Sequence, residues 1–140
     1  MREQMFKILE CEHVKKIFNS NSSISSDDKN EFIQQYKSLL NQTKGVNGVV
    51  YVFTTEKAIP RLKGHNNILY IGQTKNDMWS RYSVKNDTNT FWDVYQHAIK
   101  TYGSIHIDVY QTIDPVATER TFLKNYYSSH KELPPINRKG

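Results

Sequence analysis

The feature that most constrains the fold is a pair of short apolar segments rich in β-branched and aromatic residues. Residues 49–55 read Val-Val-Tyr-Val-Phe-Thr-Thr, and residues 68–72 read Ile-Leu-Tyr-Ile-Gly. This composition is typical of β-strands. The connector between them, residues 56–67, is polar and contains Pro60 and Gly64, which favour a loop. The sequence therefore predicts an antiparallel hairpin with a long loop.

Helical patterns surround this hairpin on both sides. Apolar residues at helical spacing predict helices over residues 3–19, 27–44, 76–85, 90–102 and 114–130. Residues 104–112 alternate between apolar and polar side chains and predict a third strand, and Pro134 and Pro135 favour an extended tail. We expect an α+β fold with a small antiparallel sheet flanked by helices. Residues 48–140 form its main domain, and residues 1–47 form an N-terminal helical extension of two helices.

Length and composition exclude several classes of protein. A chain of 140 residues suits one domain. No apolar run approaches the 18 or so residues of a membrane-spanning helix, and Lys7 and Glu10 interrupt the apolar N-terminus where a signal peptide would need continuity. The single cysteine, Cys11, excludes an internal disulfide framework and a zinc site built on cysteines. We therefore expect a cytoplasmic, intracellular protein with no membrane partner.

The charge balance favours a polyanionic partner. Lys and Arg together number 19 against 14 Asp and Glu, which gives a net charge of +5 and an isoelectric point near 9.2. Nucleic acid is the first polyanion to consider, because cations that neutralise phosphates release counterions. The same charge is also compatible with ordinary solubility. The choice therefore depends on particular residues.

Five polar residues follow the expected elements in a specific order. They are Tyr51 and Tyr70 on the two hairpin strands, Arg81 on the next helix, Glu119 on the last helix and Asn137 in the tail. Taken singly, each has an ordinary structural interpretation, since strand tyrosines usually pack and charged helix residues are usually solvated. Taken together, and with Tyr70-Ile71-Gly72-Gln73-Thr74 as the most specific piece, they resemble the GIY-YIG nuclease family. The resemblance covers roughly residues 48–140.

The resemblance implies a fold, an activity and a set of roles. It implies a three-stranded antiparallel sheet that carries both tyrosines in one cleft, and a divalent-metal-dependent endonuclease that hydrolyses DNA phosphodiester bonds, of restriction, phage or mobile-element type. Arg81 would contact the scissile phosphate, Glu119 would bind one Mg²⁺ or Mn²⁺ ion per active site, and Asn137 would support the site by hydrogen bonding. Restriction-type members of the family act as dimers, so we expect a homodimer on DNA.

Each residue type suits this chemistry. One carboxylate can hold Mg²⁺ while water and phosphate fill its other positions. A guanidinium presents a permanently charged donor fork to phosphate. A tyrosine beside a metal and an arginine can act as a general base or proton relay, and we assign that role to Tyr51, with Tyr70 orienting the water or the phosphate. The assignment predicts that Tyr51→Phe abolishes cleavage while DNA binding survives.

Three departures from the family pattern are visible. The first motif reads Val-Val-Tyr instead of Gly-Ile-Tyr, and the two tyrosines stand nineteen residues apart, where the family usually has a tighter turn. The position one helical turn after the arginine, often His or Tyr, is Lys85. The extra segment carries Lys57, Arg61 and Lys63, which together with Lys85 are candidate contacts to the DNA backbone; a solvated loop is the alternative.

Two other functions remain open on the sequence alone. One is a nucleic-acid-binding module that has lost catalysis, and the other is a protein-interaction domain in which the motif match is accidental. The accidental match predicts that Glu119 lies far from both tyrosines. The two N-terminal helices can pack on the sheet, form a dimer interface through Met5, Phe6, Leu9 and Phe18, or clamp DNA.

Overall fold

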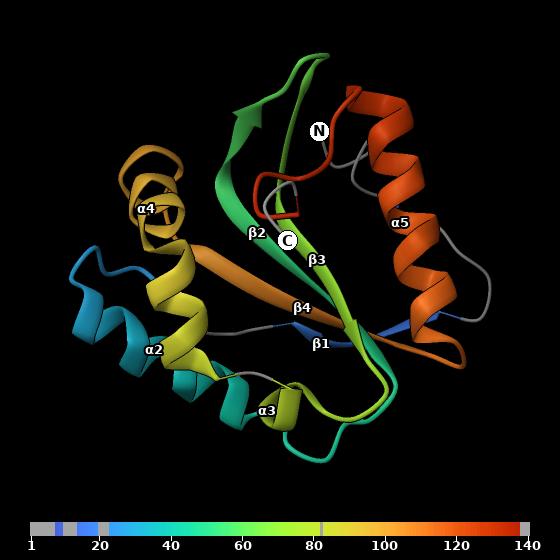
Figure 1. The fold of residues 1–140 in the computed structure, drawn as a ribbon, viewed down its shortest axis with the longest axis horizontal. Helices are drawn as coiled ribbons and strands as arrows, with labels where there is room; N and C mark the ends of the chain where they lie inside the picture. The colour runs from blue at the N-terminus through green and yellow to red at the C-terminus, as the bar shows by residue number, and fades with distance from the viewer. Residues whose placement is uncertain (1–7, 10–13, 20–22, 82, 138–140) are drawn as a thin grey trace.

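The computed structural model describes residues 8–9, 14–19, 23–81 and 83–137. Its centre is a four-stranded antiparallel sheet in the order β1-β4-β2-β3. The strands are β1 (Val14–Asn19), β2 (Val49–Pro60), β3 (His65–Thr74) and β4 (Ile105–Thr112). Figure 1 shows the long β2–β3 hairpin running from one end of the molecule to the other, with β4 crossing behind it. The expected α+β fold, an antiparallel sheet flanked by helices, is confirmed.

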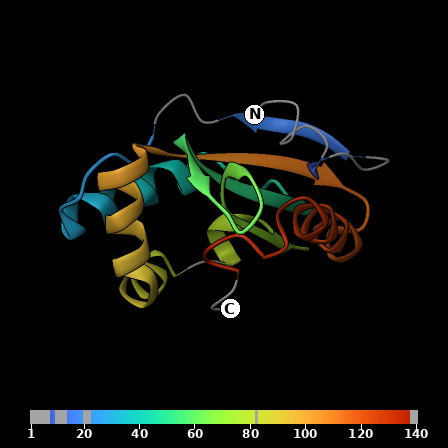
Figure 2. The same cartoon turned by 90° about the horizontal axis from the view of Figure 1, so that it is seen from above.

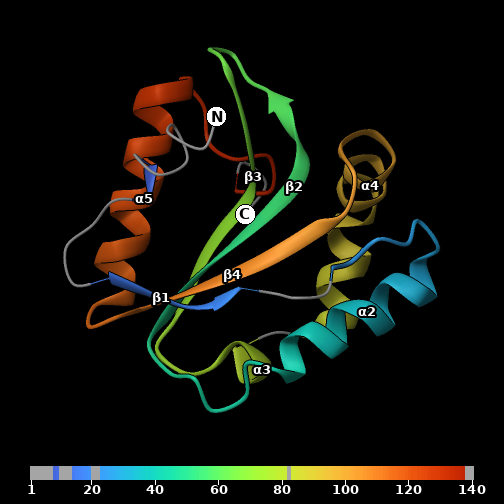
Figure 3. The same ribbon diagram turned by 180° about the vertical axis from the view of Figure 1, so that it is seen from behind.

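The first predicted helix is wrong where the structure describes it. Residues Val14–Asn19 form strand β1, which pairs along the free side of β4 (Figure 3). Val14, Ile17 and Phe18 fit a helical spacing, but the pairing partner that β4 provides decides the outcome, because a strand gains its hydrogen bonds only from a neighbour. The sheet therefore has one strand more than expected. Met5, Phe6 and most of the predicted helix lie outside the described residues.

The hairpin loop is also shorter than expected. Both strands continue through the polar connector, and only residues 61–64 turn between them. Arg61 N–H donates to the carbonyl of Gly64 at 2.9 Å, and Gly64 has a φ of +71°, which glycine adopts without strain. Pairing of Ile59 with Asn66 extends the ladder after an irregularity near Thr54. The polar composition of this segment reflects an exposed pair of strands and not a loop.

Helices cover both faces of the sheet (Figure 2). Helices α2 (Lys29–Asn41) and α4 (Val84–Tyr102) lie on one face, α5 (Pro115–His130) lies on the other, and the short α3 (Met78–Arg81) follows β3. α5 begins as predicted, with the Asp114 carboxylate accepting from Ala117 N–H and Pro115 in the first turn. In the described part of the chain, no helix is long and apolar enough to span a membrane.

Two apolar clusters hold these layers together. The larger one joins Phe32, Tyr36 and Leu39 of α2 to Tyr51 and Phe53 of the sheet. The smaller one joins Phe122 and Tyr126 of α5 to the opposite sheet face, where Ile8 is also fully buried. Since α2 enters the same core as the hairpin, the second predicted helix of the extension packs on the sheet.

Candidate active site

Tyr51 lies flat against the edge strand of the sheet. It pairs with Gly72 across the β2–β3 ladder, and its ring passes directly over that glycine. A Cβ at position 72 would stand within 2.6 Å of the Tyr51 hydroxyl oxygen and closer still to the ring, so only glycine fits. The hydroxyl reaches past Gly72 and donates to the carbonyl of Gln73 at 3.3 Å. The glycine of the Tyr-Ile-Gly motif therefore lets the Tyr51 ring extend to the outer strand.

Tyr70 stands beside Tyr51 on the same face. Their ring centroids are 6.1 Å apart, and Phe53 packs edge-on against Tyr70 at 5.5 Å. Tyr51 is only 1% exposed, whereas Tyr70 is half-buried. The structure thus brings the two motif tyrosines together, and Tyr70 is the phenol more accessible to a substrate.

Asn137 binds the outer edge of β3 at Ile71, the residue between Tyr70 and Gly72. Its Oδ1 accepts from Ile71 N–H at 2.9 Å, and its Nδ2 donates to the Ile71 carbonyl at 2.8 Å. Ile136 N–H adds a bond to the carbonyl of Leu69 at 3.2 Å. A planar amide that both accepts and donates can replace a neighbouring strand in this way. Asn137 therefore fixes the backbone of the motif.

Arg81 is carried at the end of α3, and Asp77 holds that helix in place. The Asp77 carboxylate accepts from Ser80 N–H at 3.0 Å and from Gly45 N–H at 2.6 Å, and these hydrogen bonds lower the pKa of Asp77. Arg81 itself is exposed. Because Asp77, the residue before α3, anchors this short helix, the backbone of Arg81 has a fixed position while its side chain is exposed to solvent.

Glu119 lies near Arg81, although it comes from α5 on the opposite sheet face. Burial is the largest influence and raises the pKa of Glu119, while the charges of Arg120 and Arg81 oppose that rise. Figure 1 shows how this happens, since α3 and the first turns of α5 lie at the same end of the hairpin. The predicted pair of a phosphate-binding arginine and a metal-binding carboxylate is therefore close enough to interact electrostatically.

A third carboxylate, Asp87 in the first turn of α4, was not found by sequence reasoning. Its Oδ2 accepts from the hydroxyls of Tyr36 at 2.8 Å and Tyr95 at 2.6 Å. Burial raises the pKa of Asp87, and the two hydrogen bonds and the charge of Arg81 oppose the rise. Asp87 therefore binds the aromatic core directly and lies within electrostatic range of Arg81. Its only sequence signal was an acidic residue near a helix N-terminus, which is common for structural reasons alone.

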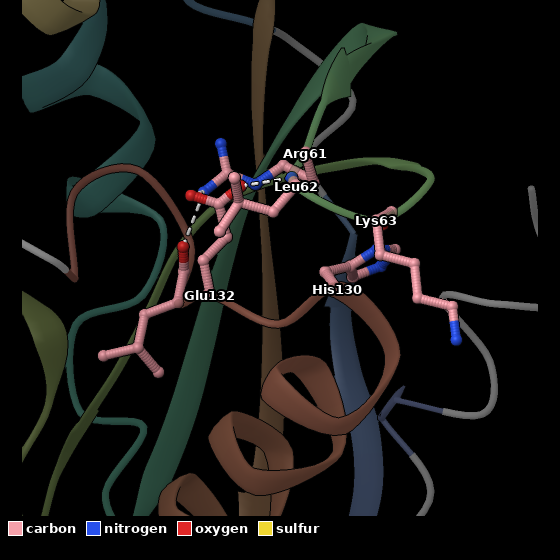
Figure 4. A network of polar contacts seen from close by, with 6 residues as sticks. Arg61, Leu62, Lys63, His130 and Glu132 are labelled. Carbon is pink, nitrogen blue, oxygen red and sulfur yellow. Dashed lines mark hydrogen bonds and ion pairs between the residues drawn. The ribbon is translucent and has the colours of Figure 1, made fainter.

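The four basic residues predicted to contact DNA divide into two kinds, and Figure 4 shows one of each kind, Arg61 and Lys63. Arg61 pairs with Glu132 at 2.9 Å, with the two side chains 7% and 9% exposed, and it also donates to the carbonyl of Leu133 at 2.7 Å. Lys57, Lys63 and Lys85 are exposed. Arg61 was predicted to contact DNA, but its guanidinium is used inside the protein to attach the hairpin to the end of α5. The three lysines remain candidates for phosphate contact.

His130 completes this attachment. It is fully buried, its Nδ1 lies 2.8 Å from the carbonyl of Lys63, and its Nε2 lies 3.2 Å from the Asn66 side-chain nitrogen. Because a carbonyl can only accept, Nδ1 carries the proton and Nε2 accepts from the Asn66 amide. The ring therefore serves the fold by joining the turn of the hairpin to the end of α5.

The site offers one carboxylate to a metal ion. Across the described ranges, no three His, Cys, Asp or Glu side chains gather as a metal-binding group. A single-carboxylate site for Mg²⁺ is compatible with this, because magnesium commonly keeps several waters and binds substrate phosphate. The half-buried Glu119 suits such an ion, since Arg81 and Arg120 do not fully offset the burial that disfavours its charge.

Comparison with protein-family models, with curated proteins and with solved structures finds no match to this chain. Any proposal about function therefore depends on the geometry of the site and on the motif residues themselves.

Proposed function

We propose that this chain is a divalent-metal-dependent endonuclease that hydrolyses DNA phosphodiester bonds, as the resemblance to GIY-YIG nucleases implies. The observation that supports the proposal is that the five motif residues fall into two groups, one on the hairpin strands and one formed by Arg81 and Glu119. Tyr51 and Tyr70 lie side by side, Asn137 binds the strand between Tyr70 and Gly72, and Arg81 lies within the electrostatic range of Glu119. An accidental motif match predicts neither grouping.

The residues divide the work of phosphodiester hydrolysis. Arg81 neutralises charge that grows on the phosphate oxygens, with the planar geometry suited to that anion. Glu119 would hold Mg²⁺ or Mn²⁺, which when bound supplies a Lewis acid for the phosphate and an activated water. The exposed Lys57, Lys63 and Lys85 contact the flanking backbone phosphates and position the strand.

The difference in burial between the two phenols affects which of them can act as the general base or proton relay. The Tyr51 hydroxyl donates to the Gln73 carbonyl and is almost fully buried, whereas Tyr70 is partly accessible. The initial hypothesis gave the general-base role to Tyr51. We now favour Tyr70 for the contact with water or phosphate, with Tyr51 holding the edge strand. Comparing Tyr70→Phe with Tyr51→Phe at equal DNA occupancy decides between the two assignments.

The test of the activity is cleavage of supercoiled plasmid in the presence of Mg²⁺ or Mn²⁺. We expect the wild type to nick or linearise the plasmid, and Glu119→Gln and Arg81→Ala each to reduce the rate by at least about 100-fold. Glu31→Ala, which removes an exposed carboxylate from the first turn of α2, is the matched control and should cleave normally.

Two results would contradict the proposal. Plasmid binding without cleavage under any divalent metal would indicate a nucleic-acid-binding module that has lost catalysis. Equal cleavage by wild type and Glu119→Gln would indicate a contaminating nuclease. Cleavage of both strands by one site per chain calls for two copies, so sedimentation of the protein with and without DNA tests the homodimer that we propose.

A further inference from the structure

A second candidate site lies beside Arg81, in a cavity of about 300 Å³ between three helices. Lys37 and Leu40 of α2, Trp79 of α3, and Ser83, Val84 and Lys85 at the start of α4 line it. This volume is at the lower end of the range that holds small organic ligands. The roles assigned to the five motif residues do not use this cavity, and only Lys85, already proposed to contact a backbone phosphate, belongs to both.

The lining combines an aromatic surface with positive charge. Trp79 is 39% exposed, which is unusual for a large ring, and the Lys44 ammonium lies 4.3 Å from its ring centroid. That cation stabilises the indole through its π face and adds a positive charge to those of Lys37 and Lys85. Of the six lining residues that the structure describes, none is acidic. The positive charges therefore favour an anionic ligand, and the exposed indole favours a ligand that carries a flat ring of its own.

The start of α4 adds to this selection. Ser83 is the N-cap of the helix, and Val84 and Lys85 are its first residues. The helix dipole favours negative charge at that end, where the Asn86 N–H already donates to the Ser83 hydroxyl and the Asp87 carboxylate is held by Tyr36 and Tyr95. A phosphate at the mouth of the cavity would meet the N–H groups of Val84 and Lys85 together with the Lys85 ammonium.

A flat ring attached to a phosphate is a nucleotide. We propose that this cavity binds one unstacked nucleotide of the DNA strand, with the base against Trp79 and its phosphates near Lys37 and Lys85. Trp79 precedes Arg81 by two residues on the same short helix, so a strand held at Arg81 passes close to the cavity. The proposal rests on the proposed function for the identity of its ligand. A base drawn out of the stack next to the cut would fix the position of the strand.

The test measures DNA binding without chemistry. A fluorescein-labelled single-stranded oligonucleotide is titrated in EDTA, and its anisotropy gives the Kd. We expect Trp79→Ala to raise the Kd by about 5- to 150-fold, the range that follows from about 1–3 kcal/mol per stacked base. Trp79→Phe keeps a flat ring and should recover most of the affinity. Tyr127→Ala, which removes an exposed aromatic residue of α5, is the matched control.

The lysines give an independent measurement. Lys85→Gln should weaken binding and reduce the slope of log Kd against log salt by about one, because one phosphate contact is lost. Lys100→Gln, an exposed lysine in the last turn of the same helix, should leave both unchanged. Circular dichroism confirms that each variant is folded.

The outcomes separate this proposal from the nuclease activity. If Trp79→Ala binds the oligonucleotide more weakly and the wild type cuts no plasmid, the nucleotide site is supported and the endonuclease activity is rejected. If Trp79→Ala binds the oligonucleotide as tightly as the wild type and still cuts plasmid, the nucleotide site is rejected and the endonuclease activity is supported. Competition by AMP at the concentration at which the unlabelled oligonucleotide competes would overturn the assignment to a strand and identify a site for free nucleotides.

Discussion

The two ends of the β2–β3 hairpin use arginine in opposite ways. At the turn, Arg61 is buried and pairs with Glu132, which also accepts from Leu62 N–H. At the other end, Arg81 is exposed, and its charge opposes the rise that burial causes in the pKa of Glu119. A charge that closes a short, buried ion pair holds the fold. An exposed charge near a half-buried carboxylate lies where a ligand can reach it.

The largest expected effect breaks this comparison directly. Glu132→Ala should lower the free energy of unfolding by about 3–5 kcal/mol, because it leaves the Arg61 guanidinium buried without its partner. Glu119→Ala should change the free energy by less than about 0.5 kcal/mol, as is usual for a partly exposed side chain. Urea unfolding measures both. An equal loss in the two variants would show that Glu119 is as structural as Glu132, and the comparison would fail.

An intermediate effect sharpens the account of the site end. Gly72→Ala should destabilise the protein by about 1–3 kcal/mol, since its methyl group overlaps the Tyr51 ring. In a Tyr51→Ala background the same change should have almost no effect, because the ring is gone. The double-mutant cycle by chemical unfolding gives the coupling between the two positions. Additive effects would mean that the ring does not lie over the glycine.

The smallest effect is a pH dependence at Asp87. Burial raises the pKa of Asp87, so the folded state binds the proton of this carboxyl group more tightly than the unfolded state does. The resulting stability is present below the ordinary aspartate pKa of about 3.9 and is lost as the pH rises through the raised value. Asp87→Asn removes this dependence, so its stability relative to wild type should increase from about pH 3 to about pH 7. A relative decrease would mean that the fold favours the carboxylate.

Local patterns predicted the strands of the hairpin and the start of α5. The helix expected over residues 76–85 is only the short α3, and α4 begins at Val84 where a helix was expected from residue 90. Val49–Thr55 and Ile68–Gly72 carry a composition that few other structures accept, and Asp114 with Pro115 marks the start of α5. The prediction failed at Val14–Asn19, where pairing with a strand nearly a hundred residues away overrides a spacing that also fits a helix. No local signal reports a distant pairing partner.

The candidate site was predictable only through the motif. The order of the five residues carries that information, and the structure then shows why Gly72 belongs to it. The sequence could not predict that Glu132 pairs with Arg61, or that Tyr36 and Tyr95 donate to Asp87. These contacts arise from tertiary packing between residues that are distant in the chain or on different turns of a helix. Whether a charged residue serves the fold or a ligand depends on such partners, and composition does not reveal them.

The bonds from Ile136 and Asn137 to β3 have a consequence beyond support of the motif. A site built on the outermost strand of a sheet normally leaves a row of open backbone groups, which invites strands of other molecules and leads to aggregation. Here a single amide and one backbone N–H occupy the middle of that row. The protein can thus keep reactive side chains at the rim of its sheet without offering that rim as a template for fibrous self-assembly.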